Sequence, residues 1–269
     1  MTETPSVILT IAGFDPSSGA GVTADIKTIA AHGCYGLACI TALTVQSTAG
    51  VRRVWPVEAK LVRETLEELV ADFALEAVHI GMLGGGDLAE VVADFLATRK
   101  PPNVVLDPIL KSSSGAGLLD QAGIRLLAEK FMGLANVVTP NVDEAAVLTG
   151  AEVADLPQMR AAALRLHQMG ARAVVVTGGH LDPAVDLLSV SHAGGVEEKI
   201  FQSKKLRSNF THGTGCAFST ALACNLAKGK SLPEAVLLAK AYVADAIMSS
   251  YRLGRGIGPV NHLFRMTRS

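Results

Sequence analysis

Four short apolar runs, each ended by Gly, Pro or Asp, constrain the fold of this chain more than any other feature. The runs are 78–80, 104–106, 137–138 and 174–176, and they are followed by Gly81, Asp107-Pro108, Thr139-Pro140 and Thr177-Gly178. Nearly continuous apolar runs of this length are typical of parallel strands that are buried on both faces. Ligands of such sheets bind beyond the carboxyl ends of the strands. We therefore expect the residues after these runs to lie along one binding edge.

The segments around these runs predict further strands and amphipathic helices. Strands are expected at 7–11 and within 37–45, and helices at Gly21–Ala31 and 58–72. The last third of the chain is expected to be mostly helical, over 214–228 and 232–251. This alternation predicts an α/β fold with a central, mostly parallel sheet and helices on both faces. Because no linker or repeat interrupts the pattern, we expect one domain over residues 1–269.

The composition supports this fold and argues against several classes of protein. Hydrophobic residues make up 49% of the chain and aromatic residues only 4%, so the core is built on aliphatic side chains. The formal net charge of -1 offers no basic field for nucleic acid. The N-terminal segment shows no signal-peptide pattern, and the 4 cysteines have no metal-site or disulfide spacing. We expect a reduced, cytoplasmic protein that binds neither nucleic acid nor membrane.

The run 211–217 opens a long apolar helix and carries the strongest chemical signal. Gly213 and Gly215 flank Thr214, so backbone N–H groups can turn toward a ligand without a Cβ in the way. The helix start adds the positive end of its dipole, which favours an anion such as phosphate. Cys216 would lie on the first turn, where the dipole lowers the pKa of a thiol, and could orient or accept the proton of an attacking hydroxyl. The alternative is a simple turn in which Cys216 only packs.

Two other segments each allow a functional and a structural interpretation. The loop 12–21 does not match the dinucleotide or P-loop glycine patterns, but it would let a small substrate lie close to the backbone, near Asp25. Otherwise Asp25 is a solvated helix residue. In the segment 139–145, Asn141 and Glu144 have the spacing of a capping box. The same two side chains could instead hold Mg²⁺ through water molecules.

Taken in order, these segments resemble the ribokinase superfamily, and within it the hydroxymethylpyrimidine and phosphomethylpyrimidine kinases of thiamine biosynthesis. The residues that carry the resemblance are the loop 12–21 with Asp25 and Lys27, the run 40–46, Ile80-Gly81-Met82-Leu83, Asp107-Pro108, Thr139-Pro140-Asn141 with Glu144-Ala145, and His212-Gly213-Thr214-Gly215-Cys216. Each motif alone is weakly specific, but together they follow the family's order over nearly the whole chain. The resemblance implies a three-layer α/β/α fold and a homodimer.

The resemblance also implies a role for each matching residue. The pyrimidine would be held by Gly13, Asp25, Gln46 and Met82. Gly213, Gly215 and the N–H of Cys216 would form an anion hole, and Cys216 would activate the hydroxymethyl group of the substrate. Mg²⁺–ATP would be arranged by Asn141, Glu144 and Asp107, with Lys240, Val243 and the segment that begins at Thr177 on the nucleotide side.

The chain departs from the family pattern at two phosphate-contacting positions. Thr177 stands where members usually have lysine. Ser113, Ser114 and Gly115 stand where members commonly have an Ala-Lys-Ser-Gly run. We expect Lys111, or a basic residue of the segment 204–207, to supply the charge for the ATP phosphates instead.

The activity implied by the resemblance is ATP-dependent phosphorylation of 4-amino-5-hydroxymethyl-2-methylpyrimidine and of its monophosphate. A pyridoxal or pyridoxine kinase is the nearest alternative, because that ring also carries a hydroxymethyl group; Gln46 and Met82 favour the pyrimidine. A non-catalytic ligand-sensing protein on the same scaffold is a second alternative, although Cys216, Asn141 and Glu144 argue against it. A dinucleotide dehydrogenase shares the α/β pattern, but its fingerprint glycines are missing.

Overall fold

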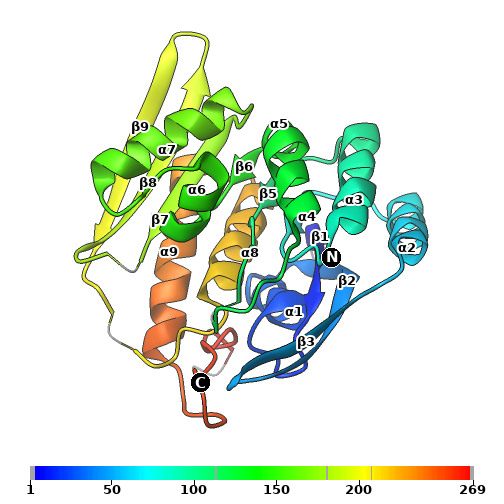
Figure 1. Ribbon diagram of the computed structural model, residues 1–269. Coiled ribbons are helices and arrows are strands. Elements are labelled where there is room, and N and C mark those ends of the chain that lie inside the picture. Colours follow the sequence, from blue (N-terminus) through cyan, green and yellow to red (C-terminus); the bar gives the residue numbers. More distant parts are fainter. Residues whose placement is uncertain (1–3, 113, 180, 207, 267–269) are drawn as a thin grey trace.

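The computed structural model describes residues 4–112, 114–179, 181–206 and 208–266. Within them the chain forms a nine-stranded sheet of order β3-β2-β1-β4-β5-β6-β7-β8-β9 (Figure 1). The strands are β1 (Val7–Phe14), β2 (Tyr35–Ser47), β3 (Gly50–Pro56), β4 (Ala77–Ile80), β5 (Val104–Leu106), β6 (Val137–Val138), β7 (Ala173–Gly178), β8 (Ala184–His192) and β9 (Gly195–Ser203). The pairs β2–β3, β7–β8 and β8–β9 are antiparallel, and the pairs between β2 and β7 are parallel.

Helices cover both faces of this sheet (Figure 1). One face carries α2 (Ala59–Asp72), α3 (Gly86–Arg99), α4 (Gln121–Leu126), the π-helical turn η1 (Leu127–Phe131), α5 (Met132–Leu134), α6 (Val142–Thr149) and α7 (Leu156–Gln168). The other face carries α1 (Gly21–Ala31), α8 (Thr214–Ala227) and α9 (Leu232–Met248). The expected three-layer α/β/α architecture with a mostly parallel sheet is confirmed. Among the described helices, none has the length and apolar character needed to cross a membrane.

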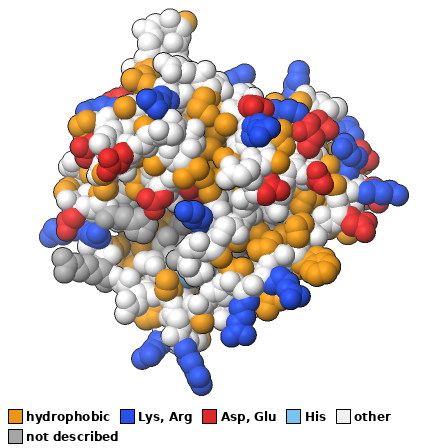
Figure 2. Space-filling model, viewed as in Figure 1, with side chains coloured by type: hydrophobic (Ala, Val, Ile, Leu, Met, Phe, Trp, Pro, Cys, Tyr) orange, Lys and Arg blue, Asp and Glu red, His pale blue; other side chains and the backbone are white. Residues whose placement is uncertain are grey.

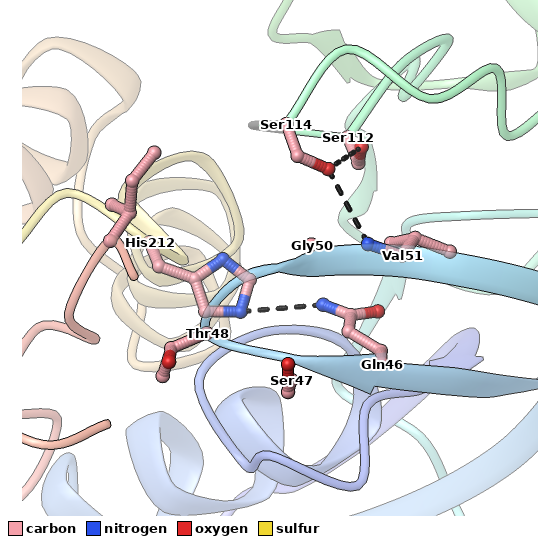
Figure 3. A pocket seen from close by; sticks show the side chains of 9 residues that line it. Gln46, Ser47, Thr48, Gly50, Val51, Ser112, Ser114 and His212 are labelled. Atoms are coloured by element: carbon pink, nitrogen blue, oxygen red, sulfur yellow. Dashed lines mark hydrogen bonds between the residues drawn. The ribbon is translucent and has the colours of Figure 1, made fainter. Parts of the chain in front are cut away.

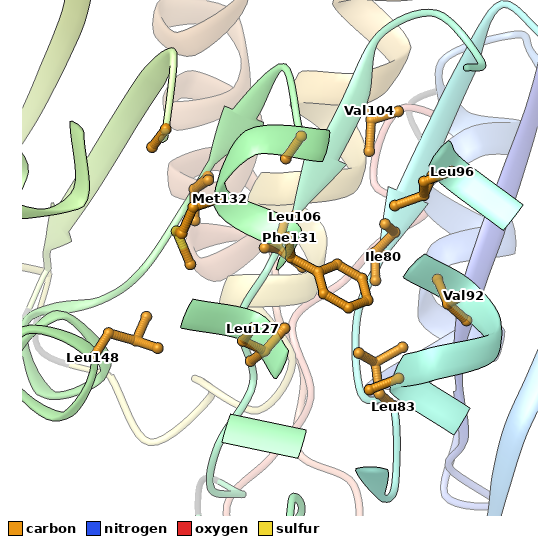
Figure 4. Packing of buried hydrophobic residues seen from close by; sticks show 14 of the residues in the cluster. Ile80, Leu83, Val92, Leu96, Val104, Leu106, Leu127, Phe131, Met132 and Leu148 are labelled. Carbon is orange, nitrogen blue, oxygen red and sulfur yellow. The ribbon is translucent and has the colours of Figure 1, made fainter. Parts of the chain in front are cut away.

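Successive residues of the central strands belong to two different hydrophobic clusters. In β5, Val104 and Leu106 pack with α3, η1 and α5, as Figure 4 shows, whereas Val105 packs with α8 and α9. In β1, Leu9 faces the first cluster and Ile8 the second. Side chains alternate across a strand, so a strand covered on both faces needs apolar residues at every position. This requirement explains the continuous runs in the sequence.

Most of the expected elements are confirmed, but the C-terminal third differs. Residues 184–203 form the antiparallel strands β8 and β9, so the expectation of a mostly helical last third is wrong there. The strand β9 is exposed at every position except Phe201, and its sequence therefore lacks the alternation of a half-buried strand. The helix α1 has the expected bounds, and α9 ends at Met248, three residues before the expected end.

Candidate active site

A cavity of about 930 Å³ lies where the carboxyl ends of the central strands meet the start of α8. Such a volume suits a small-molecule ligand. Its walls include the end of β1 (Gly13, Phe14) with Asp15, the end of β2 (Thr44, Gln46), Met82 after β4, the segment after β5 (Asp107, Lys111), the start of α6 (Asn141, Glu144) and the residues 211–216. The strand ends β1, β4 and β5 therefore share one binding edge with α6 and α8.

The predicted site residues fall into two groups in the structure. Those that line the cavity are Gly13, Gln46, Met82, Asp107, Lys111, Asn141, Glu144, Gly213, Gly215 and Cys216. Asp25, Thr177, Lys240 and Val243 do not line it. Val243 packs in the core beside α8, and Thr177 pairs with Asn141 in an isolated bridge. The structure therefore gives Val243 no place on the surface of this cavity.

The start of α8 presents unpaired backbone N–H groups. Gly213 adopts the left-handed conformation with φ 84°, and a Cβ there would lie 1.9 Å from the carbonyl oxygen of Gly19, so only glycine fits. The first helical hydrogen bond runs from Ala217 N–H to the Gly213 carbonyl at 2.9 Å. Among the described residues, the N–H groups of Gly215 and Cys216 have no hydrogen-bond acceptor. Donors of this kind at a helix start form an anion site.

Cys216 lies at the wall of the cavity with its side chain 8% exposed. Burial raises the pKa of this thiol well above its ordinary value of 9.0, and the charges of Asp25 and Asp107 raise it further. The expected lowering of the pKa by the helix start is therefore wrong, because the surrounding carboxylates and the loss of water outweigh the dipole. Near neutral pH the group is a thiol, which can orient a hydroxyl group by hydrogen bonding.

Two acidic side chains with raised pKa values face the cavity beside Cys216. Burial raises the pKa of Asp107 to about 6, although His79 and a hydrogen bond from Ser219 act in the opposite direction. Burial raises the pKa of Glu144 to about 8, and the negative charge of Asp107 adds to this effect. A nearby cation would reduce the repulsion between two ionised carboxyl groups and favour their charged forms. This corner of the cavity therefore suits a positively charged ligand.

Asn141 and Glu144 form the capping box that the sequence predicted. The Glu144 N–H donates to Asn141 Oδ1 at 2.9 Å, and the Asn141 N–H donates to Glu144 Oε2 at 3.0 Å. The two oxygen atoms keep lone pairs beyond these bonds, and both residues line the cavity. The structural interpretation is thus confirmed, and it leaves room for a water-mediated role with a cation.

Asp25 is neither a solvated helix residue nor a residue of the cavity wall, so both interpretations of it need correction. Its side chain is fully buried and accepts hydrogen bonds from Thr10 Oγ1 at 2.7 Å and from Thr220 Oγ1 at 2.8 Å. His79, also fully buried, lies 3.4 Å from Asp25 through Nδ1. These contacts hold α1 and α8 against the sheet below the cavity.

His79 connects this buried carboxylate to the cavity. Its Nε2 lies 2.9 Å from Ser219 Oγ, which donates to Asp107 Oδ2 at 3.1 Å. Burial alone would lower the pKa of His79, but the charge of Asp25 and the hydrogen bond to it raise the pKa above the ordinary value. No sequence motif marks His79 as functional, because it stands inside an apolar strand. The structure makes it the counterion of two buried carboxylates.

A second group of residues that the sequence did not assign lies at the mouth of the cavity. His212 Nε2 donates to Asp15 Oδ2 at 2.8 Å, and both side chains are buried. Gln46 Nε2 lies 3.4 Å from the same His212 nitrogen (Figure 3). A smaller pocket of about 20 Å³ adjoins this point and is lined by the β2–β3 turn and Ser114. Two sequence signals could have identified the Asp15–His212 pair: the turn pattern Asp15-Pro16-Ser17 and the position of His212 directly before Gly213.

Of the lysine side chains expected near the ATP phosphates, one lines the cavity and the others do not. Lys111 is exposed and lines the cavity. Lys240 instead pairs with Asp186, whose other oxygen accepts from the Gly178 N–H at 3.0 Å. Lys204 and Lys205 are exposed outside the cavity wall. Ser113 and Arg207 lie outside the described residues, so Lys111 is the cation of the predicted set that the structure brings to the cavity.

Comparisons with known proteins identify the family and the fold. The family model described as phosphomethylpyrimidine kinase matches residues 15–261. A hydroxymethylpyrimidine/phosphomethylpyrimidine kinase of Streptomyces coelicolor is 42% identical over 260 residues, which cover 96% of this chain and 95% of the relative. The thiamine biosynthesis bifunctional protein ThiED of Geobacter sulfurreducens is 41% identical over 95% of this chain and 52% of its own length. Among solved structures, an ADP complex of Bacillus subtilis pyridoxal kinase superposes with a TM-score of 0.88 at 31% identity, covering 98% of this chain and 100% of that one.

Proposed function

The chain belongs to the phosphomethylpyrimidine kinase family, and on that basis we propose that it transfers the γ-phosphoryl group of ATP to 4-amino-5-hydroxymethyl-2-methylpyrimidine and then to its monophosphate. The pathway served is thiamine biosynthesis, in keeping with the names of its relatives. The proposal rests on the N–H groups of Gly215 and Cys216, which have no acceptor among the described residues and form an anion site. Both residues line the cavity that the Cys216 thiol also lines. Phosphoryl transfer needs such positioning and charge stabilisation more than covalent chemistry.

The ends of β1 and β2 would hold the pyrimidine ring. Gly13 lets the backbone approach the ligand, since a Cβ there would lie 2.8 Å from Met82 Sδ. Met82 supplies an apolar surface for the ring, and the amide of Gln46 supplies polar contacts to it. The hydroxymethyl group would then lie beside Cys216, whose thiol orients the hydroxyl by hydrogen bonding, and the proton of the hydroxyl would pass to the transferred phosphoryl group.

Oxygen donors at the start of α6 and the end of β5 fit a hydrated Mg²⁺. Asn141, Glu144 and Asp107 line the cavity together. Among the described residues there is no group of three or more His, Cys, Asp or Glu able to hold a metal ion directly. Mg²⁺ keeps several waters and commonly uses one or two carboxylates together with substrate phosphates. When bound, the ion would neutralise charge on the ATP phosphates, and the three side chains would hold its waters.

The proposed activity is tested by incubating the wild-type protein with the aminopyrimidine alcohol and Mg-ATP. We expect mass spectrometry to detect first the monophosphate and then the pyrophosphate ester, because the cavity of about 930 Å³ has room for the alcohol and for its monophosphate. ATP hydrolysis without a phosphorylated pyrimidine would refute the proposal. Accumulation of the monophosphate alone would limit the enzyme to the first step.

Phosphorylation of pyridoxal is the second candidate activity, and the similarity to pyridoxal kinase is the observation that favours it. Pyridoxal also carries a hydroxymethyl group on an aromatic ring, so the Cys216 chemistry would serve both substrates. The sensing alternative is disfavoured because the anion site and the thiol open into the same cavity. Parallel assays with both alcohols decide the order, and a larger kcat/KM for pyridoxal would reverse it.

Lys111 is expected to contribute to ATP binding. The Lys111→Ala variant should raise KM for ATP by about threefold to tenfold, because a partly solvated contact of a cation with phosphate contributes about 0.5–1.5 kcal/mol. Steady-state kinetics with varied ATP measure the change. Lys204→Ala, which removes an exposed lysine outside the cavity wall, is the matched control. Unchanged KM and kcat in Lys111→Ala would exclude this residue from ATP binding.

We further propose that the protein is a cytoplasmic homodimer. All 4 cysteines are free thiols, as is typical of a reducing compartment. An apolar face on the antiparallel pair β2–β3 supports the dimer: Leu43 and Trp55 are cross-strand partners that are 49% and 65% exposed, and Val45 beside them is 57% exposed. Hydrophobic side chains gather over this part of the molecule in Figure 2. Sedimentation equilibrium should give twice the chain mass of 28.0 kDa, and a monomer would refute the proposal.

A further inference from the structure

The hydrogen bonds around Gln46 determine which way its side-chain amide is turned. Its Nε2 lies 3.4 Å from His212 Nε2, so two nitrogen atoms face each other (Figure 3). Its Oε1 lies 3.2 Å from Thr44 Oγ1. The oxygen and nitrogen of an amide have nearly the same shape, and their assignment follows from the donors and acceptors around them.

The proton on His212 Nε2 is fixed by Asp15. Asp15 accepts from the Ser17 N–H at 2.8 Å, from Ser17 Oγ at 2.7 Å and from the Ala20 N–H at 3.0 Å. Burial alone would raise the pKa of this carboxyl, but the hydrogen bonds from His212 and Ser17 lower it below 3.8, so Asp15 is ionised. The His212 nitrogen, 2.8 Å away, must therefore carry the proton that it donates. A protonated ring nitrogen has no lone pair and cannot accept from the Gln46 amide.

The hydroxyl group of Thr44 has one proton, and its use also determines how the Gln46 amide is turned. Thr44 Oγ1 lies 2.9 Å from the carbonyl oxygen of Phe14, which can only accept. The hydroxyl proton of Thr44 is used in that bond, so toward Gln46 the Thr44 oxygen can only accept. Gln46 must therefore offer it an N–H group. Thr44 and His212 thus require the same orientation of the amide independently.

We propose that Thr44 and the Asp15–His212 pair are positioning residues, which hold the Gln46 amide with Oε1 toward His212 and Nε2 toward Thr44. Turning the amide over would break the hydrogen bond to Thr44 and bring two N–H donors together at His212. The cavity then presents one fixed acceptor beside one fixed donor. The ligand class that matches this edge has a ring nitrogen next to an exocyclic amine, as in a 4-aminopyrimidine. The substrate part of this inference rests on the proposed function, whereas the amide orientation does not.

The orientation is tested on the protein itself by neutron diffraction from perdeuterated crystals without substrate. We expect nuclear density for an ND₂ group beside Thr44, for a bare oxygen beside His212, and for a deuteron on His212 Nε2. An ND₂ group beside His212, or a His212 Nε2 without a deuteron, would overturn the inference. This measurement remains valid even if the aminopyrimidine proves not to be the substrate.

The role in specificity is tested by Thr44→Val, which keeps the shape of the side chain but removes the acceptor for Gln46. We expect KM for the aminopyrimidine alcohol to rise about tenfold, since one fixed hydrogen bond is lost, with kcat and KM for pyridoxal within about twofold. Pyridoxal has no exocyclic amine and is the matched probe. Thr44→Ser keeps the hydroxyl and should restore both KM values. Equal rises for both alcohols would show that Thr44 only tethers Phe14, and would overturn the role in specificity.

Discussion

Replacement of Cys216 by alanine is expected to lower kcat by about 10–10²-fold, because the attacking hydroxyl loses its alignment, with KM for ATP within about twofold of the wild-type value. The thiol is the ionisable group that stands on the first turn of α8, next to the unpaired N–H groups of the anion site. Burial and the nearby carboxylates keep it protonated near neutral pH. Its contribution is therefore to align the attacking hydroxyl by hydrogen bonding, while the proton of the hydroxyl passes to the transferred phosphoryl group. Steady-state kinetics with the aminopyrimidine alcohol measure the loss.

A second buried cysteine of the same helix provides the control. Cys224 is fully buried two turns further along α8 and does not line the cavity. Cys224→Ala also removes one buried thiol from α8, so it should lower the stability of the protein but leave kcat within about twofold. If Cys216→Ala kept kcat within about threefold of wild type, the thiol would not be the group that aligns the hydroxyl. Asp107 would then be the next candidate, because its pKa of about 6 leaves it ionised at neutral pH.

The parallel centre of the sheet could be predicted from the sequence because strands that are buried on both faces need apolar residues at almost every position. The runs at β4, β5, β6 and β7 consist of Val, Ile and Leu with few exceptions. The strands β3 and β9 have no such apolar run, since they lie at the two edges of the sheet and are mostly exposed. Exposed positions tolerate charged residues, and the period of two is lost there.

The cavity-lining residues could be predicted where a motif fixes the backbone, as at Gly213 and Asn141. Roles that depend on distant partners could not. Burial raises the pKa of Cys216, and Asp25 and Asp107, which are far from it in sequence and meet it only in the folded chain, raise it further. Lys240 was expected to line the nucleotide side, but it pairs with Asp186 of β8 and does not line the cavity. Local sequence patterns do not contain these long-range pairings, so both expectations failed.

Replacement of His79 by leucine is expected to lower the free energy of unfolding by about 3–5 kcal/mol, because it removes the partner of a buried charge. Asp25 would keep its hydrogen bonds from Thr10 and Thr220 but lose the imidazolium 3.4 Å away. Ser219 would lose its contact with the ring at 2.9 Å, which weakens the link to Asp107. Urea unfolding measures the change through its midpoint.

The pH dependence separates the charge of His79 from its packing. A histidine whose pKa is raised by folding stabilises the protein fully below its unfolded value of 6.5, and this stabilisation is lost as the pH rises through the folded value. The difference between wild type and His79→Leu should therefore be largest below pH 6.5 and shrink at higher pH. His192→Leu, at an exposed histidine, should change stability by less than about 0.5 kcal/mol. A loss in His79→Leu that is the same at every pH would mean that the ring acts by packing alone, and not as the counterion of Asp25.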